Sequence, residues 1–170
     1  MSDAEAIIKS VTGSGVLTLT INRPQRRNAL STAVVQGLLV ALAQAKGDPA
    51  VKVVVLTGAG ERAFCAGGDL AGSMTGGGGL PARVADKAAY ADLLRALQGL
   101  GKPSVARVNG SAYGGGVELM LACHLVIAAD EAQVVRARTW IKRLDRTRNA
   151  DERRLFVYFD GSYRNLERNL

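Results

Sequence analysis

The chain has 170 residues, of which 22 are Lys or Arg and 15 are Asp or Glu, and its formal net charge is +7. That length suits one domain with its own core, and a hydrophobic share of 48% excludes general disorder. No stretch approaches the roughly 20 apolar residues of a membrane span, and the N-terminus lacks the apolar segment of a secretory signal. Two cysteines, Cys65 and Cys123, make no disulfide framework, so we expect a cytoplasmic protein without a membrane partner.

The composition changes near residue 133. Residues 134–170 hold ten basic and five acidic residues, and 19 of the 20 glycines come before them. Five of the eight aromatic residues lie in the same stretch. These shifts predict a core over 1–133 and a divergent basic tail over 134–170, either helical or poorly ordered.

Strand and helix patterns alternate along the first 133 residues. Strands are predicted at 16–22, 51–57, 104–109 and 125–129, and helices from Ser31 to Gly47, from Pro81 to about Leu100 and over 114–123. Apolar residues take alternate positions in 16–22, which is typical of a half-buried strand. Residues 51–57 are mostly β-branched and apolar and residues 125–129 are all apolar, so both segments are expected to be buried strands. Ser31 is the expected N-cap of the first helix. Strands that alternate with helices predict an α/β fold.

The glycine-rich segments favour no nucleotide site. Gly58–Ala63 follows a strand and fits G-x-G-x-x-A, but residues 64–69 carry two more glycines and no acid follows near position 78. A dinucleotide site needs both the helix and the acid. The glycines at 76–79 lack the G-K-[ST] of a phosphate loop, and we expect a mobile loop there.

A nucleophilic site would have to use His124, the only histidine. It lies between apolar runs and no G-x-S-x-G segment is present, so we interpret it as a packed or partly exposed side chain. Cys65 and Cys123 stand among small and apolar residues, which indicates inert core positions. No metal site is predicted.

Two further segments, 63–70 and 109–119, are typical of an oxyanion hole, because their glycines let backbone approach a ligand closely. The second runs into an apolar helix, whose first N–H groups lack intrahelical partners. Two converging N–H groups stabilise a developing negative charge. Glu118 stands in the first turn of that helix. It is either an acid–base residue in apolar surroundings or a complement to the helix dipole, and the pattern leaves both open.

These segments resemble the enoyl-CoA hydratase/isomerase family, the crotonase superfamily, over about residues 5–133. The motifs are, in order, Leu19–Pro24, Arg27–Ser31, Val54–Gly58, Ala63–Leu70, Lys102–Pro103 and Asn109–Glu118. Each motif alone is weak evidence for the family, but their combination and order along the chain are specific to it. The resemblance implies a crotonase-like spiral of ββα turns, truncated in this chain and followed by the divergent tail. It also implies assembly as homotrimers or hexamers.

The resemblance implies a catalytic set. The backbone N–H groups of Ala66 and Gly115 would bind the carbonyl of an acyl-CoA thioester and stabilise its enolate, and Glu118 would handle water and protons. The coenzyme A thioester would be the substrate, with no separate cofactor. The activity implied is that of an enoyl-CoA hydratase, a lyase, or of an isomerase in fatty acid metabolism.

The resemblance also implies substrate-binding residues. They are Arg26, Arg27 and Ala29 in a turn against the coenzyme A nucleotide, and Ala66, Gly67, Gly68, Asp69 and Gly115 in the glycine-rich segments. The two arginines would pair with phosphates. Asp69 would hydrogen-bond the backbone of its own loop.

The tail departs from the family. After Gln133 the family continues with an aromatic residue and a Pro-Glu pair that carries the second hydratase acid, whereas this chain reads Val134–Trp140. With one acid left, we expect impaired hydration. The alternatives are a catalytically inactive protein that binds coenzyme A or nucleic acid, and a frameshifted or fused product without function. Acids interleaved with the arginines of the tail make nucleic acid the less favoured partner.

Overall fold

The structure is a computed structural model that describes residues 6–69, 80–129, 132 and 156–160. Its strands are β1 (Ile7–Val11), β2 (Val16–Ile21), β3 (Val53–Gly58), β4 (Ala63–Cys65), β5 (Ser104–Val108), β6 (Ser111–Ala112), β7 (Leu125–Ala129) and β8 (Phe156–Asp160). Its helices are α1 (Thr32–Gly47), α2 (Leu80–Gln98) and α3 (Gly115–Leu121), with a 3-10 turn, η1, at Pro24–Arg26.

Six strands form the main sheet in the order β1-β2-β3-β5-β7-β8. β1 pairs antiparallel with β2, and all other neighbours pair parallel. Parallel neighbours need a crossover, and α1, α2 and α3 lie in the three crossovers that lead to β3, β5 and β7. β4 and β6 pair in a second, two-stranded sheet. The predicted α/β fold is confirmed.

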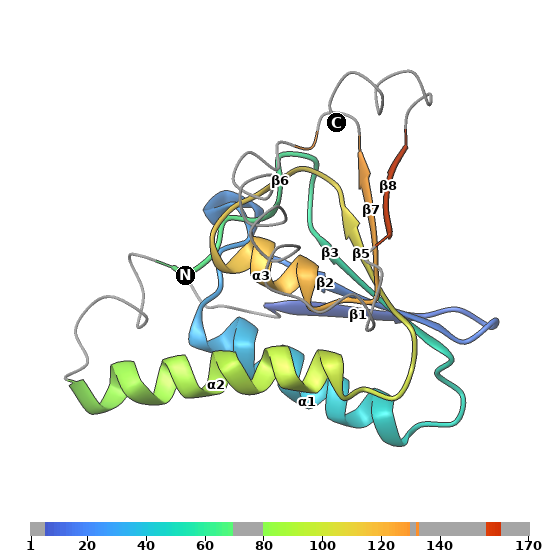
Figure 1. The fold of residues 1–170 in the computed structure, drawn as a ribbon, viewed down its shortest axis with the longest axis horizontal. Coiled ribbons are helices and arrows are strands. Elements are labelled where there is room, and N and C mark those ends of the chain that lie inside the picture. The colour runs from blue at the N-terminus through green and yellow to red at the C-terminus, as the bar shows by residue number, and fades with distance from the viewer. Residues whose placement is uncertain (1–5, 70–79, 130–131, 133–155, 161–170) are drawn as a thin grey trace, which may run out of the picture.

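The core lies between the sheet and the three helices (Figure 1). Leu19 of β2, Val54 of β3 and Ala106 of β5 are fully buried on that face. The α1 helix begins as predicted, because the Ser31 Oγ accepts a hydrogen bond from the Val34 N–H at 3.4 Å. Its apolar residues recur every three or four positions, and those that are buried are Val34, Val35, Leu38, Ala41, Leu42 and Ala45.

Two strands are less buried than predicted. In β7, Val126 and Ala128 are buried, whereas Leu125 and Ile127 are 36% and 43% exposed. Val53 of β3 is likewise only partly buried. The reason is that the described helices pack against one face of the sheet, so alternate side chains point to the other face (Figure 1).

Within the predicted tail, the structure describes residues 156–160, and these form β8 beside β7 rather than a helix. The other residues of 134–170 and the glycines at 76–79 lie outside the described part of the chain. No helix among the described residues is long and apolar enough to cross a membrane.

The loops that follow β2, β3 and β5 meet at one edge of the sheet, because parallel strands end on the same side. Asn28 joins the first two loops although it is fully buried. Its Oδ1 accepts from the Arg23 N–H at 3.0 Å, and its Nδ2 donates to the carbonyls of Ala59 and Ala63 at 3.0 and 2.7 Å. Asn28 thereby satisfies backbone groups of two loops at once.

Asn109, in the loop after β5, also binds the loop after β3. Its Oδ1 accepts from the Gly58 N–H and the Thr57 Oγ1, each at 3.0 Å, and its Nδ2 donates to the Gly60 carbonyl at 2.5 Å. The loop between β3 and β4 is therefore held by two asparagines. Buried backbone groups that would otherwise lack partners are satisfied in this way.

A buried ion pair joins the loop after β2 to the turn after β4. The Arg23 Nη1 lies 2.8 Å from the Asp69 Oδ2 and donates to the Ala29 carbonyl at 2.9 Å. Both side chains are about nine-tenths buried. The Asp69 carboxylate thus contacts a side chain from a distant loop, whereas the sequence analysis expected it to hydrogen-bond the backbone of its own loop.

The substitution Asp69→Ala is expected to lower the free energy of unfolding by about 3–5 kcal/mol, because it removes the carboxylate that faces the buried Arg23. The control is Asp92→Ala, which breaks the Asp92–Arg95 pair on the exposed surface of α2 and is expected to cost less than about 1 kcal/mol. Urea unfolding of both variants measures the difference. Equal losses would contradict the structural role assigned to the buried pair.

Candidate active site

The two glycine-rich segments lie in backbone contact. β4 pairs with β6, and the Tyr113 N–H donates to the Cys65 carbonyl at 3.0 Å. A Cβ added at Gly116 would overlap that carbonyl oxygen. Gly67 adopts a φ of +86°, and a Cβ there would lie 2.7 Å from the Tyr113 carbonyl oxygen and 3.1 Å from the Gly115 nitrogen. Glycine is therefore required on both sides of this contact.

The Ala66 N–H is already engaged. It donates to the Arg27 carbonyl at 3.0 Å. An amide that bonds to the protein backbone is not free to bind a substrate oxygen, so the prediction that Ala66 donates to the thioester is corrected. Its hydrogen bond instead fixes the turn against the loop after β2.

Some of the other backbone N–H groups at this site already donate a hydrogen bond within the protein, and others do not. Gly67 donates to the sulfur of the preceding cysteine at 3.4 Å, and Asp69 donates to the Leu30 carbonyl at 3.1 Å. Within the described ranges, no acceptor is found for the N–H of Gly68 or of Gly115. Gly115 is the first residue of α3, where an N–H has no intrahelical partner. These two amides are the available donors.

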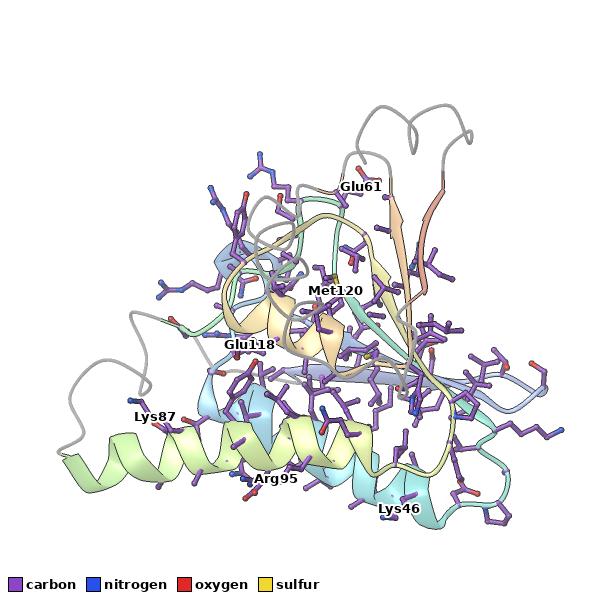
Figure 2. All side chains as sticks on the ribbon, viewed as in Figure 1. Lys46, Glu61, Lys87, Arg95, Glu118 and Met120 are labelled. Carbon is purple, nitrogen blue, oxygen red and sulfur yellow. The ribbon has the colours of Figure 1, made fainter. Side chains whose placement is uncertain are left out.

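Glu118 stands in the first turn of α3, three residues after Gly115. Figure 2 places it on the N-terminal part of the helix, between α3 and α2. Its side chain is exposed, so the apolar surroundings expected from the sequence are not formed by the described residues. An exposed carboxylate at this place is accessible to a ligand that enters from solvent.

Tyr90 of α2 is a site residue that the sequence analysis missed. Its hydroxyl donates to the Gly115 carbonyl at 2.6 Å. Burial, followed by the negative charge of Glu118, raises the pKa of Tyr90 far above its ordinary value, so the phenol stays protonated. In the sequence it is one more apolar position of a helix, and no local pattern marks it.

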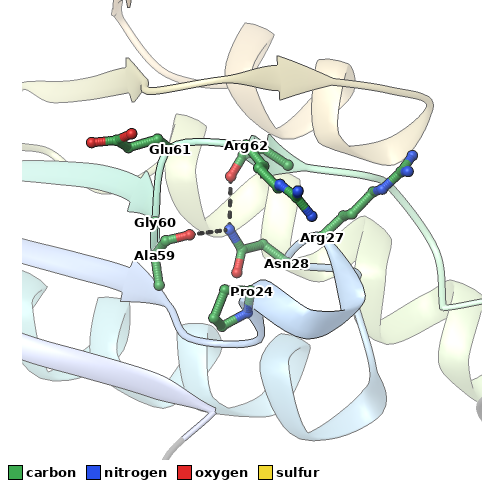
Figure 3. Close-up of a pocket in the computed structure, with 8 residues that line it drawn as sticks. Pro24, Arg27, Asn28, Ala59, Gly60, Glu61 and Arg62 are labelled. Atoms are coloured by element: carbon green, nitrogen blue, oxygen red, sulfur yellow. Dashed lines mark hydrogen bonds between the residues drawn. The ribbon is translucent and has the colours of Figure 1, made fainter.

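A pocket of about 460 Å³ opens at the same edge of the sheet (Figure 3). It is lined by Pro24, Arg27, Asn28, Ala59, Gly60, Glu61, Arg62 and Ala63. Figure 3 shows the side chains of Arg27 and Arg62 on one side of the pocket, with Glu61 directed away from them. Two guanidinium groups on one side suit an anionic ligand.

Two of the predicted nucleotide-binding residues do not line this pocket. Arg26 is exposed on the turn η1 but is not part of the wall. The side chain of Ala29 is buried, and its carbonyl accepts from Arg23. Arg62 was not predicted, although its place after the glycines of the loop that follows β3 is the signal that could have found it.

Cys65 and Cys123 are buried, and burial raises the pKa of each thiol to about 12. Both are therefore protonated core residues, as predicted. His124 is exposed, and its Nδ1 lies 2.7 Å from the Ser104 Oγ and accepts from the Ser104 N–H at 3.2 Å. Ser104 is buried and begins β5, at the opposite end of that strand from Asn109, so this pair does not form a nucleophilic site.

No group of three or more His, Cys, Asp or Glu side chains that could hold a metal ion is found in the described part of the chain.

The chain is similar to solved structures along most of its length. An enoyl-CoA hydratase from Bacillus anthracis is 36% identical, with a TM-score of 0.70 over 75% of this chain and 48% of that one. An enoyl-CoA hydratase from Mycobacterium smegmatis is 37% identical, with a TM-score of 0.71 over 75% of this chain and 49% of that one. A Pseudomonas aeruginosa protein is 41% identical, with a TM-score of 0.71 over 78% and 56%. The chain spans about half the length of these relatives.

The family model for enoyl-CoA hydratase/isomerase matches residues 11–141. That match covers the six motifs from the strand β2 to Glu118, including both glycine-rich segments. The fold of the solved relatives agrees with it. The chain belongs to the enoyl-CoA hydratase/isomerase family.

Proposed function

We propose that this chain binds an acyl-CoA thioester and stabilises the enolate at its α-carbon. The observation that carries the proposal is the pair of available N–H groups, at Gly68 and Gly115, on two backbones in contact. The thioester oxygen gains negative charge as the α-proton leaves. Donors that are fixed in place before the reaction stabilise this charge without reorganising.

Glu118 is the proposed base. Its carboxylate takes the α-proton, the C–H bond breaks, and the electron pair moves toward the thioester oxygen, which the two amides bind. The step leaves an enolate and a protonated Glu118. Because the sequence carries no Pro-Glu pair after Gln133, we propose that proton exchange or isomerisation is favoured and hydration is impaired.

Arg27 and Arg62 are the proposed partners of the coenzyme A phosphates. They line one side of the pocket that the loops after β2 and β3 form. Guanidinium groups bind phosphate with two parallel hydrogen bonds. The acyl-CoA is the substrate and no other cofactor is proposed. The trimeric or hexameric assembly and the cytoplasmic location stay predictions.

The proposal predicts that the protein catalyses exchange of the α-hydrogens of a saturated acyl-CoA with deuterium from D₂O. Glu118→Gln is expected to slow exchange by about 10²–10⁴-fold, because a general base is lost, while binding is retained. Mass spectrometry measures exchange and a thermal shift measures binding. Binding without exchange in the unmodified protein would sink the catalytic part and favour the inactive, coenzyme A-binding alternative.

A second prediction concerns the phosphates. Arg62→Ala is expected to weaken binding of an acyl-CoA by about tenfold, since it removes one charged hydrogen-bond partner of a phosphate. Binding of the matching acyl-pantetheine thioester, which lacks the nucleotide, should not change. Isothermal titration of both ligands makes the comparison. An equal loss with both ligands would show that Arg62 acts on the fold and not on the nucleotide.

A third prediction concerns the contact between the two backbones. Alanine is better than glycine inside a helix by about 1 kcal/mol, yet Gly116→Ala is expected to abolish the thermal shift with acyl-CoA, because the new Cβ pushes α3 away from Cys65. The control is Gly47→Ala at the end of α1, where a Cβ meets nothing within 4 Å. The same ligand-induced shift in both variants would contradict the requirement for close approach.

A further inference from the structure

Residues 66–69, which we call the glycine turn, are hydrogen-bonded through their backbone to the loop after β2. The Leu30 N–H donates to the Gly67 carbonyl at 2.8 Å, and the Leu30 carbonyl accepts from the Asp69 N–H at 3.1 Å. Leu30 and Gly68 form the parallel bridge between these two bonds. Gly68, which carries one of the two available N–H groups, is therefore held in place by the loop after β2.

Arg27, in the same loop, contacts both the glycine turn and the pocket. Its carbonyl accepts a hydrogen bond from the Ala66 N–H at 3.0 Å. Its side chain lines the pocket, on the same side as Arg62 (Figure 3). One residue thus connects the wall of the pocket with the first amide of the glycine turn.

The backbone of Arg27 and Asn28 is strained. Their φ angles are +50° and +55°, in the left-handed region that disfavours residues other than glycine. The buried side chain of Asn28 is fixed by its hydrogen bonds to the loop after β3. Arg27 is exposed, and its guanidinium has no hydrogen-bond or ion-pair partner among the described residues. The conformation of Arg27 is therefore held by main-chain bonds, including the one from Ala66.

We propose that an anion bound in the pocket holds the glycine turn closed through Arg27. When the turn opens, the bond between the Ala66 N–H and the Arg27 carbonyl breaks. The backbone of Arg27 then leaves the strained left-handed region, and its guanidinium moves away from the pocket wall. An anion that is hydrogen-bonded to this guanidinium opposes the movement and thereby opposes the opening of the turn.

This inference rests on the proposed function for the identity of the anion, which is a phosphate of coenzyme A. Its consequence is that the nucleotide end of the substrate keeps the Gly68 N–H in place at the thioester end. Binding energy from a part of the substrate that does not react is then used at the reacting atoms. Arg27 is a positioning residue for Gly68 as well as a partner of the phosphate.

Hydrogen exchange of backbone amides, followed by NMR of the full ¹⁵N-labelled chain, tests the inference. The probe is adenosine 3′,5′-bisphosphate, the nucleotide end of coenzyme A, and the control is adenosine, which has no phosphate. At twenty times its dissociation constant, the probe is expected to slow exchange at Ala66 and Asp69 about twentyfold, because a ligand that binds only the closed turn reduces opening by that factor. Adenosine is expected to change neither rate.

Two variants test whether the effect passes through Arg27. Arg62→Ala removes the other guanidinium, but the Arg62 carbonyl accepts from the Ser111 N–H of β6 and not from the glycine turn. Each variant is measured at twenty times its own dissociation constant for the probe. We expect Arg62→Ala to keep the slower exchange at Ala66 and Arg27→Ala to lose it while the probe is bound.

Three results overturn the inference: no binding of the probe, binding without slower exchange at Ala66, and equal slowing in Arg27→Ala. A core amide serves as the reference for global unfolding. The N–H of the fully buried Val54 donates to the Pro103 carbonyl at 3.0 Å, and without ligand it is expected to exchange more slowly than Ala66. Equal rates would mean that the turn opens only when the whole chain unfolds, which also overturns the inference.

The two proposals fail separately. Slower amide exchange with the probe, in a chain that does not exchange the α-hydrogens of an acyl-CoA, removes the proposed catalysis and leaves the link between the pocket and the glycine turn. Exchange of α-hydrogens, in a chain whose turn amides do not respond to the bound probe, leaves the proposed function and removes the link.

Discussion

At the hydrogen bond between the Tyr113 N–H and the Cys65 carbonyl, two segments far apart in the sequence come into backbone contact. The rest of the site depends on that contact. Side chains at Gly67 or Gly116 would force the segments apart, and the amides of Gly68 and Gly115 would no longer belong to one site. The two backbones can approach this closely only where side chains are absent. A single added Cβ at Gly67 or Gly116 would therefore disrupt the contact.

The surroundings of this contact are polar and buried, which makes them rigid. Asn28 and Asn109 satisfy backbone groups of the loop after β3, and the Arg23–Asp69 pair ties the glycine turn to the loop after β2. Buried polar groups are costly when a partner is lost. The positions of the Gly68 and Gly115 amides are therefore set by folding, as the proposed stabilisation of an enolate requires.

Periodic segments were predictable from the sequence, and single hydrogen bonds were not. The spacing of apolar residues predicted α1 and β2, and the motifs identified which two segments meet. The short strands β1, β4 and β6 escaped prediction because each depends on a partner strand more than on its own pattern. A motif also does not show which amide of a turn points away from the backbone. For that reason the prediction that the Ala66 N–H binds the thioester oxygen was wrong, since this N–H donates to the Arg27 carbonyl. Tyr90 was invisible because its role comes from packing between helices.

The burial of the two cysteines has a consequence for how this protein can be followed in solution. Cys65 lies beneath the glycine turn, and Cys123 lies after the end of α3, where the chain enters β7. A thiol-specific reagent reaches either sulfur only when the surrounding structure opens. The modification rate of each thiol therefore reports one local opening event, at the glycine turn for Cys65 and at the start of β7 for Cys123. Both rates can be measured without a substrate and without an activity assay.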